Sequence, residues 1–157
     1  MTTPCRARSD IEMSNIFLAR REHLPFVAEL EKEVFSEPWS EKSLELCLTQ
    51  QAFCVCCFED GALASYCTVI TVLDEAQIIN VATRPDFRGR GYAREAINAV
   101  FEECRKRGII SISLEVRESN IPAISLYKGY GFTIEGKRKA FYTNPREDAF
   151  VMIKNLD

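Results

Sequence analysis

The first third of the chain has hydrophobic positions that predict a short strand followed by two helices. The apolar run Ile16–Ala19 predicts a first strand. Between Glu22 and Phe35, apolar residues recur at near-helical spacing, which predicts an amphipathic helix. Ser40 is a suitable residue to begin a second helix, since Leu44 and Leu48 then form an apolar stripe.

Three consecutive segments then show the composition of β-strands. Ala52–Phe58 is followed by the turn signal Glu59-Asp60-Gly61, which leads into a second strand over Ala62–Leu73. A third strand is expected over Gln77–Thr83. Short connections of this kind join antiparallel neighbours, so these strands are predicted to form a meander.

The second half of the chain alternates between helix and strand. An apolar face that includes Ala93, Ile97 and Cys104 predicts a helix with a C-terminal cap at Gly108. Apolar and polar residues alternate after it and predict a strand over 110–117. The remaining predicted elements are a helix over about Asn120–Tyr130, ending at Gly131, and closing strands near Phe132–Lys137 and Ala149–Leu156.

These elements predict an α/β (α+β) fold, a mixed and mostly antiparallel sheet flanked by helices. A chain of 157 residues suggests one domain. Residues 1–13 are charged and lack an apolar run, so we expect a disordered N-terminal extension followed by a single domain over 14–157.

Composition narrows the class of protein. Hydrophobic residues make up 46% and charged residues 27% of the chain, as in an ordinary globular protein. No segment approaches the roughly 18 apolar residues of a membrane span, and the N-terminus does not resemble a secretory signal. We therefore expect a cytoplasmic protein without a membrane partner. The net charge of −3 argues against nucleic-acid binding, which needs a basic face.

The seven cysteines do not follow a metal-binding pattern. Cys54, Cys56 and Cys57 crowd one apolar stretch, and the other four are scattered. Zinc sites pair such a motif with a second one, which is missing here, and disulfide frameworks belong to small secreted chains. We expect buried, reduced thiols and no metal.

The segment Arg88-Gly89-Arg90-Gly91-Tyr92-Ala93 lies between a predicted strand and a predicted helix. Glycines there allow backbone N–H groups to approach an anion, and the helix N-terminus adds a positive dipole end. The segment is neither a P-loop nor a dinucleotide fingerprint, because the G-K-S/T and G-x-G-x-x-G patterns are absent. A pyrophosphate is the expected ligand; the alternative is an ordinary helix-start loop with solvated arginines.

The order of strand, R-G-R-G-Y-A, helix, strand and then Asn120 to Tyr127 resembles the GNAT superfamily of acetyl-CoA-dependent N-acetyltransferases. The family pattern is R/Q-x-x-G-x-G/A, and Arg88, Gly91 and Ala93 match its three defined positions. The resemblance implies the GNAT fold and acetyl-CoA as cosubstrate, with its pyrophosphate bound by residues 88–93. It also implies that Val81, Ala82 and Thr83 offer backbone groups to the acetyl-pantetheine arm, and that Asn120 contacts the coenzyme.

Several further segments resemble the RimI branch of the superfamily, the ribosomal-protein-alanine N-acetyltransferases. The resemblance implies acetylation of the N-terminal alanine of small-subunit ribosomal protein eighteen. Two departures are Ala93, where many relatives have glycine, and a shorter loop at Phe141–Pro145. The matching segments are P-W-S-E-K (38–42), L-D-E-A (73–76), L-E-V-R (114–117), S-N (119–120), A-I-S-L-Y (123–127), G-F (131–132) and R-E-D-A (146–149).

Two residues are candidates for catalysis. Glu115 lies on the polar face of its predicted strand and can take a proton from an amine, directly or through water. Gln77 and Asn80 on the preceding strand cannot titrate, so the role of base falls on Glu115, with Glu75 in reserve. The resemblance gives Tyr127 the role of proton donor. The alternatives are an exposed strand acid for Glu115 and a core aromatic for Tyr127, and Asn120 also suits a helix N-cap.

The nature of the acceptor amine is less constrained by the residues themselves. An α-amino group is easier to deprotonate than a lysine side chain, and acidic residues outside the coenzyme loop favour a basic peptide. Two other functions remain open: a GNAT enzyme acting on a small-molecule amine, another protein N-terminus or a lysine, and a catalytically silent acyl-CoA-binding module. The acidic residues in question are Glu33, Glu37, Asp74 and Glu75.

Overall fold

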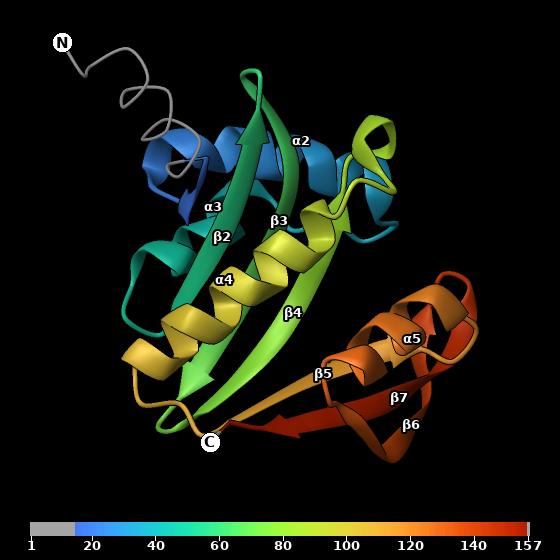
Figure 1. Ribbon diagram of the computed structural model, residues 1–157. Helices are drawn as coiled ribbons and strands as arrows, with labels where there is room; N and C mark the ends of the chain where they lie inside the picture. Colours follow the sequence, from blue (N-terminus) through green and yellow to red (C-terminus); the bar gives the residue numbers. More distant parts are fainter. Residues whose placement is uncertain (1–14, 157) are drawn as a thin grey trace, which may run out of the picture.

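The computed structural model describes residues 15–156, and in them seven strands form one sheet in the order β1-β2-β3-β4-β5-β7-β6 (Figure 1). The predicted N-terminal extension lies outside the described residues. The strands are β1 (Ile16–Leu18), β2 (Ala52–Glu59), β3 (Ala62–Val72), β4 (Glu75–Thr83), β5 (Ser111–Arg117), β6 (Thr133–Thr143) and β7 (Arg146–Asn155). The α-helices are α2 (Leu24–Val34), α3 (Glu41–Leu44), α4 (Tyr92–Lys106) and α5 (Ile121–Gly129). Short 3₁₀ helices are η1 (Arg21–His23), η2 (Glu45–Leu48) and η3 (Pro85–Phe87).

The sheet is mixed, as predicted. Strands β1 to β4 pair in antiparallel fashion, and so do β5 with β7 and β7 with β6. Only β4 and β5 are parallel among the described strands, because the long helix α4 carries the chain back across the sheet between them. This one parallel pair joins the N-terminal meander to the C-terminal strands.

Helices cover both faces of the sheet (Figure 1). On one face, α4 and α5 pack over a core that includes Ile97, Leu114 and Tyr127. On the other face, α2, α3 and η2 pack over a second core that includes Leu30 and Tyr66. The alternation predicted for β5 is confirmed, since Ile112, Leu114 and Val116 are buried and the residues between them are half-buried.

The two C-terminal strands are longer than predicted. The sequence pattern ended one strand at Lys137 and began the next at Ala149, whereas β6 continues to Thr143 and β7 begins at Arg146. Strand β6 is the edge strand at the C-terminal end of the sheet, and most of its side chains are exposed. Because backbone pairing with β7, not burial of alternate side chains, defines this segment, it has no hydrophobic period to detect.

Candidate active site

Strands β4 and β5 begin side by side and then separate, as Figure 1 shows. Their parallel register runs from Glu75 opposite Ser111 to Ile78 opposite Leu114 and ends there. Strand β4 continues to Thr83 and β5 to Arg117 without further pairing between them. The separation leaves a gap in the middle of the sheet, flanked by backbone that has no strand partner on that side.

A bulge in β4 lies at the start of this gap. Thr68 on β3 is opposite Asn80, and Val69 is opposite Ile78, so Ile79 is the extra residue. Thr68 Oγ1 accepts the Asn80 N–H at 3.2 Å and stabilises the irregularity. Because one inserted residue reverses the alternation of a strand, Asn80 points to the same face as Gln77.

The residues predicted to contact the acetyl-pantetheine arm lie directly after the bulge. Val81, Ala82 and Thr83 pair with β3 on one side, opposite Cys67, Tyr66 and Ser65. Their other side faces the gap, where no strand of residues 15–156 pairs with them. Backbone groups there are available to a ligand.

The glycine-bearing loop leads into α4 beside the gap. Gly89 and Gly91 adopt left-handed conformations, with φ of 79° and 84°. Gly91 is the N-cap of α4, and the first backbone bond of the helix joins the Glu95 N–H to the Gly91 carbonyl at 3.1 Å. The N–H groups of residues 89–94 have no acceptor within the described part of the chain. These donors and the helix dipole form a suitable cradle for a pyrophosphate.

The glycine-bearing loop has free space in front of its backbone and is hydrogen-bonded to strand β3. A Cβ atom built on Gly89 or Gly91 meets no atom of the described residues within 4 Å, so these residues leave the space in front of the backbone free. Ser65 Oγ donates a hydrogen bond of 3.0 Å to the Tyr92 carbonyl, which ties the start of α4 to β3. The Arg90 guanidinium carbon lies 5.4 Å from the centroid of the Phe87 ring.

Glu115 lies on β5, close to the point where the strands separate, on the face of the sheet opposite α4 and α5. Its side chain is 12% exposed, and both carboxylate oxygens have partners. Gln77 Nε2 on β4 donates to Oε1 at 2.7 Å. The Arg138 guanidinium on β6 forms an ion pair with Oε2 at 3.2 Å. Sequence reasoning selected Glu115 but did not foresee either partner.

The reserve candidate for the base lies at the wrong end of the sheet. Glu75 is the first residue of β4 and is exposed, opposite Ser111, which lies four residues before Glu115 on the parallel strand. Four residues correspond to roughly 13 Å along a strand. Glu75 is therefore remote from the gap, whereas Gln77 contacts Glu115 directly.

Tyr127 occupies the other face of the sheet. It lies on α5, is buried, and packs edge-on against Phe132 with ring centroids 5.7 Å apart. Burial raises the pKa of the Tyr127 phenol well above its usual value, so the hydroxyl stays protonated at any ordinary pH. Asn120 is exposed and is the N-cap of α5, where its Oδ1 accepts the Ala123 N–H at 3.3 Å.

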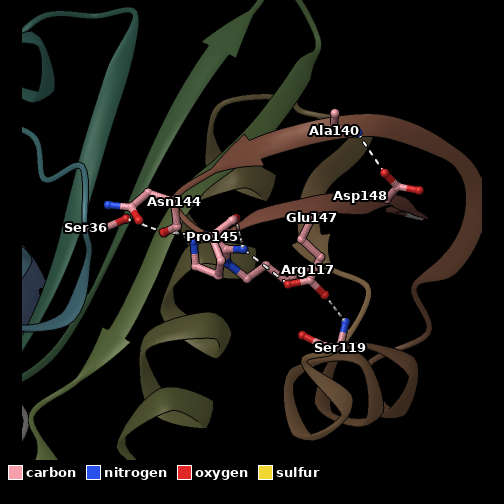
Figure 2. A network of polar contacts seen from close by, with 8 residues as sticks. All are labelled: Ser36, Arg117, Ser119, Ala140, Asn144, Pro145, Glu147 and Asp148. Atoms are coloured by element: carbon pink, nitrogen blue, oxygen red, sulfur yellow. Dashed lines mark hydrogen bonds and ion pairs between the residues drawn. The ribbon is translucent and has the colours of Figure 1, made fainter.

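The hairpin of β6 and β7 is held near the gap by the network of polar contacts shown in Figure 2. Arg117 Nη2 on β5 donates to the Asn144 carbonyl at 3.3 Å, and its Nη1 donates to Glu147 Oε1 at 3.2 Å. Glu147 Oε2 accepts the Ser119 N–H at 2.6 Å. Ser36 Oγ, which follows α2, donates to the Asn144 carbonyl at 2.9 Å. The end of the hairpin thus connects β5 with the segment after α2.

This network also places a tyrosine that sequence reasoning did not select. Tyr142 on β6 packs beneath Arg117, whose guanidinium carbon lies 4.2 Å from the ring centroid. Burial raises the pKa of Tyr142 to about 12. A second neutral phenol therefore stands on the hairpin beside Glu115.

A buried carboxylate, Glu31, connects the elements next to the site by hydrogen bonds. Glu31 on α2 has no solvent exposure and accepts hydrogen bonds from the Trp39 N–H and Asn80 Nδ2, both at 2.9 Å, and from the Tyr66 hydroxyl. It therefore joins α2, the segment before α3, and strands β3 and β4. In the sequence, Glu31 fell on the buried stripe of its helix, but the pattern gave no indication of its partners.

We expect Glu31→Leu to lower the free energy of unfolding by about 3 kcal/mol, because three donors, of which the Tyr66 hydroxyl is fully buried, lose their acceptor. Urea denaturation measures the change. Glu29→Leu, on the exposed side of the same helix, is the matched control and should stay within roughly 0.5 kcal/mol of the parent. Equal stabilities for the two variants contradict the prediction.

The cysteines in residues 15–156 are buried free thiols, as predicted for them. Burial raises the pKa of Cys47, Cys57 and Cys104 to about 11 and raises that of Cys67 well above its usual value, so these thiols are protonated and unreactive. No group of three or more metal-ligating side chains occurs in the same residues.

We predict that no cysteine is catalytic. Cys67→Ala and Cys104→Ala should each lower stability by about 1–2 kcal/mol through lost packing while leaving kcat within twofold of the parent. Chemical denaturation and steady-state rates on the same samples separate the two effects. Mass-spectrometric trapping of an acetyl-cysteine enzyme would show the prediction to be wrong.

A gap in a mixed sheet, an anion cradle at a helix N-terminus and a carboxylate with a phenol beside the gap define an acyl-CoA-dependent N-acyltransferase. Residues 24–132 match the family described as "Acetyltransferase (GNAT) family", and the chain belongs to this family, whose cosubstrate is acetyl-CoA. The resemblance drawn from the sequence is therefore confirmed.

Two relatives that carry a more specific name are similar to this chain over most of their length. The [ribosomal protein bS18]-alanine N-acetyltransferase of Escherichia coli K12 is 33% identical over 142 residues, which cover 89% of this chain and 96% of that protein. A Bacillus subtilis (strain 168) relative, provisionally given the same name, is 38% identical over 135 residues, covering 85% and 89% of the two chains.

Solved structures agree with these relatives. The crystal structure of the Escherichia coli ribosomal-protein-S18-alanine N-acetyltransferase matches with a TM-score of 0.83 and 32% identity, covering 90% of this chain and 93% of that one. The crystal structure of Arabidopsis thaliana NAA60 in complex with acetyl-CoA matches with a TM-score of 0.80 and 17% identity, covering 90% of this chain and 97% of that one, which shows that the fold is shared. No helix of residues 15–156 is long and apolar enough to cross a membrane.

Proposed function

We propose that this protein transfers the acetyl group of acetyl-CoA to the N-terminal α-amine of ribosomal protein bS18, whose first residue is alanine. The observation that carries the proposal is the position of Glu115, held by Gln77 where β4 and β5 separate, with the buried Tyr127 on the opposite face of the sheet. The two relatives described above, which align over most of their own length, support the choice of protein substrate.

The coenzyme would enter from the side of α4 and α5. N–H groups of Gly89, Arg90, Gly91, Tyr92 and Ala93 would bind the pyrophosphate, with Arg88 adding positive charge. The backbone of residues 81–83 would bind the acetyl-pantetheine arm in the gap, and Asn120 would contact the coenzyme from the start of α5. This arrangement leaves the opposite face, where Glu115 lies, for the peptide.

Transfer is direct and needs no acyl-enzyme. The neutral amine nitrogen attacks the thioester carbonyl carbon, and the tetrahedral adduct collapses with cleavage of the carbon–sulfur bond. Glu115 takes the proton that the nitrogen loses, directly or through water. Tyr127 donates a hydrogen bond to the sulfur as negative charge develops there. The thiolate then gains a proton from water, and Glu115 releases to water the proton that it took from the nitrogen. Because burial raises the pKa of Tyr127, its main role is hydrogen bonding and not full proton transfer.

An α-amine suits this site better than a lysine side chain. Its pKa of about 7.8, against about 10.4 for lysine, makes deprotonation at neutral pH easier by roughly 3.5 kcal/mol. On the peptide side, Glu37 accepts a hydrogen bond of 2.7 Å from Thr143 on the hairpin and adds negative charge where a basic peptide would pass. We place the reaction in the cytoplasm, with residues 14–157 as the catalytic domain and with no nucleic acid as partner.

The test is an acetylation assay with labelled acetyl-CoA and a panel of acceptors. A peptide with the N-terminal sequence of bS18 should be acetylated at its α-amine, as located by tandem mass spectrometry. The same peptide with its α-amine blocked and one internal lysine should be inert. Faster turnover of a polyamine or another small amine would favour the second candidate function, and binding of acetyl-CoA without turnover of any amine would indicate a silent module.

A further inference from the structure

The ion pair between Arg138 and Glu115 connects the edge strand of the sheet to the proposed base. Glu115 is opposite Val151 on β7, and Arg138 is opposite Ala149, so the arginine side chain crosses β7 to reach β5. Its Nε lies 3.2 Å from Glu115 Oε2. The two side chains differ in exposure, 59% for Arg138 and 12% for Glu115.

The backbone of β6 has an irregularity directly after this arginine. The register with β7 shifts between Arg138 and Tyr142, which leaves the intervening residues unpaired in a bulge. Ala140 in the bulge has a φ of 52°, and its N–H donates to Asp148 Oδ1 at 2.7 Å (Figure 2). Lys139, which directly follows Arg138, is exposed and forms no ion pair within the described residues.

Other charges near Glu115 cannot replace Arg138. Arg117 on the same strand is already paired with Glu147 at 3.2 Å. Gln77 on β4 is a neutral amide, and burial raises the pKa of the phenols of Tyr142 and Tyr127, so both stay neutral at assay pH. On the α2 side, the group joined to β4 is Glu31, which accepts a hydrogen bond from Asn80 and is itself a carboxylate, so it adds no positive charge. Without Arg138, the Glu115 carboxylate would have no cationic partner among residues 15–156.

An uncompensated carboxylate beside the gap has a chemical cost for an acetyltransferase. It attracts an amine as its ammonium ion, and an ammonium nitrogen has no lone pair with which to attack a thioester. A carboxylate already paired with a guanidinium offers no net attraction to the ammonium but still accepts a hydrogen bond from a neutral amine.

We propose that Arg138 is a positioning residue that acts as the counter-ion of Glu115 and makes the acceptor site select the neutral form of the peptide amine. The inference rests on the proposed function. When the amine attacks, its nitrogen becomes positively charged and attracts Glu115 Oε2 away from the exposed guanidinium. The proton then passes from nitrogen to Oε2, while Gln77 continues to hold Oε1 and Arg138 remains charged.

The test compares Arg138→Gln with two matched variants, Arg138→Lys, which retains the charge, and Lys139→Gln, which removes a neighbouring charge. Kinetics with the alanine peptide are measured at pH 6.5 and 8.5, where about 5% and about 80% of the α-amine is neutral. Calorimetry at both pH values compares the peptide with its N-acetylated, uncharged form.

We expect Arg138→Gln to bind the free-amine peptide several-fold more tightly than the parent at pH 6.5, with unchanged affinity for the acetylated peptide. Its kcat should fall roughly tenfold at pH 6.5 and recover at pH 8.5, and its KM for acetyl-CoA should not change. Arg138→Lys should retain most of the parent behaviour, and Lys139→Gln should match the parent.

Two results overturn the inference: an unchanged ratio of the two peptide affinities in Arg138→Gln, or the same change in Lys139→Gln. Both are read from binding and require a parent protein that binds the peptide. If the parent itself leaves the peptide unmodified at both pH values, the proposed function fails first, and the binding comparison still decides the role of Arg138.

Discussion

Glu115→Gln should lower kcat by about 10² to 10⁴ while acetyl-CoA binds almost as tightly as to the parent. Glutamine retains the shape of the side chain and loses the basic oxygen, so the loss falls on removal of the proton from the amine. The ion pair with Arg138 is also lost, but its partner is largely exposed, so the fold should remain stable. Steady-state kinetics, calorimetry with acetyl-CoA and thermal unfolding measure the three quantities separately.

The pH dependence distinguishes the base from the proton donor. Alkaline pH should partly restore Glu115→Gln, because above a pKa of about 8 most of the α-amine is already neutral. Tyr127→Phe should show a rate loss that alkaline pH does not repair, since the missing hydrogen bond acts on sulfur. Burial raises the pKa of Tyr127, so its ionisation should not shape the parent profile in the ordinary range. Parent-like turnover of Glu115→Gln at neutral pH, with chemistry rate-limiting, would exclude Glu115 as the base.

Gly91→Ile should weaken the binding of acetyl-CoA by roughly 10²-fold, equivalent to about 2.7 kcal/mol. The residue has a φ of 84° and lies at the N-cap of α4, where the backbone faces open space. A β-branched side chain disfavours this conformation and projects into the volume that the pyrophosphate needs. Calorimetry with acetyl-CoA measures the loss.

The chain offers a matched control for backbone strain. Gly61, in the turn between β2 and β3, has a φ of 79° and likewise has nothing within 4 Å of a built Cβ. Gly61→Ile should therefore lose about as much stability as Gly91→Ile, but its affinity for acetyl-CoA should be unchanged. Undiminished affinity in Gly91→Ile, or an equal loss in both variants, would remove the assignment of the pyrophosphate to this loop.

Much of this molecule is determined locally by its sequence. The period of hydrophobic residues predicted helices α2 and α4 and strand β5, because each buries one face and local spacing decides which side chains share it. Strands β2 and β3 are buried on both faces and were predicted from their composition and the turn between them. The glycine-bearing loop could also be predicted from the sequence, because glycine readily adopts the left-handed backbone conformation found at Gly89 and Gly91. Glu115 and Tyr127 could be selected on the same basis, one from strand alternation and both from the family motifs.

The partners of those residues depend on contacts between distant parts of the chain. Glu31 is hydrogen-bonded to Asn80, 49 positions away, and Gln77 to Glu115, 38 positions away. The bulge at Ile79 reverses the alternation of β4, and the extension of β6 follows from its pairing with β7. Only the tertiary structure decided that Arg138 pairs with Glu115, because an ion pair across three strands depends on register and bulges, and neither leaves a periodic signal in the sequence.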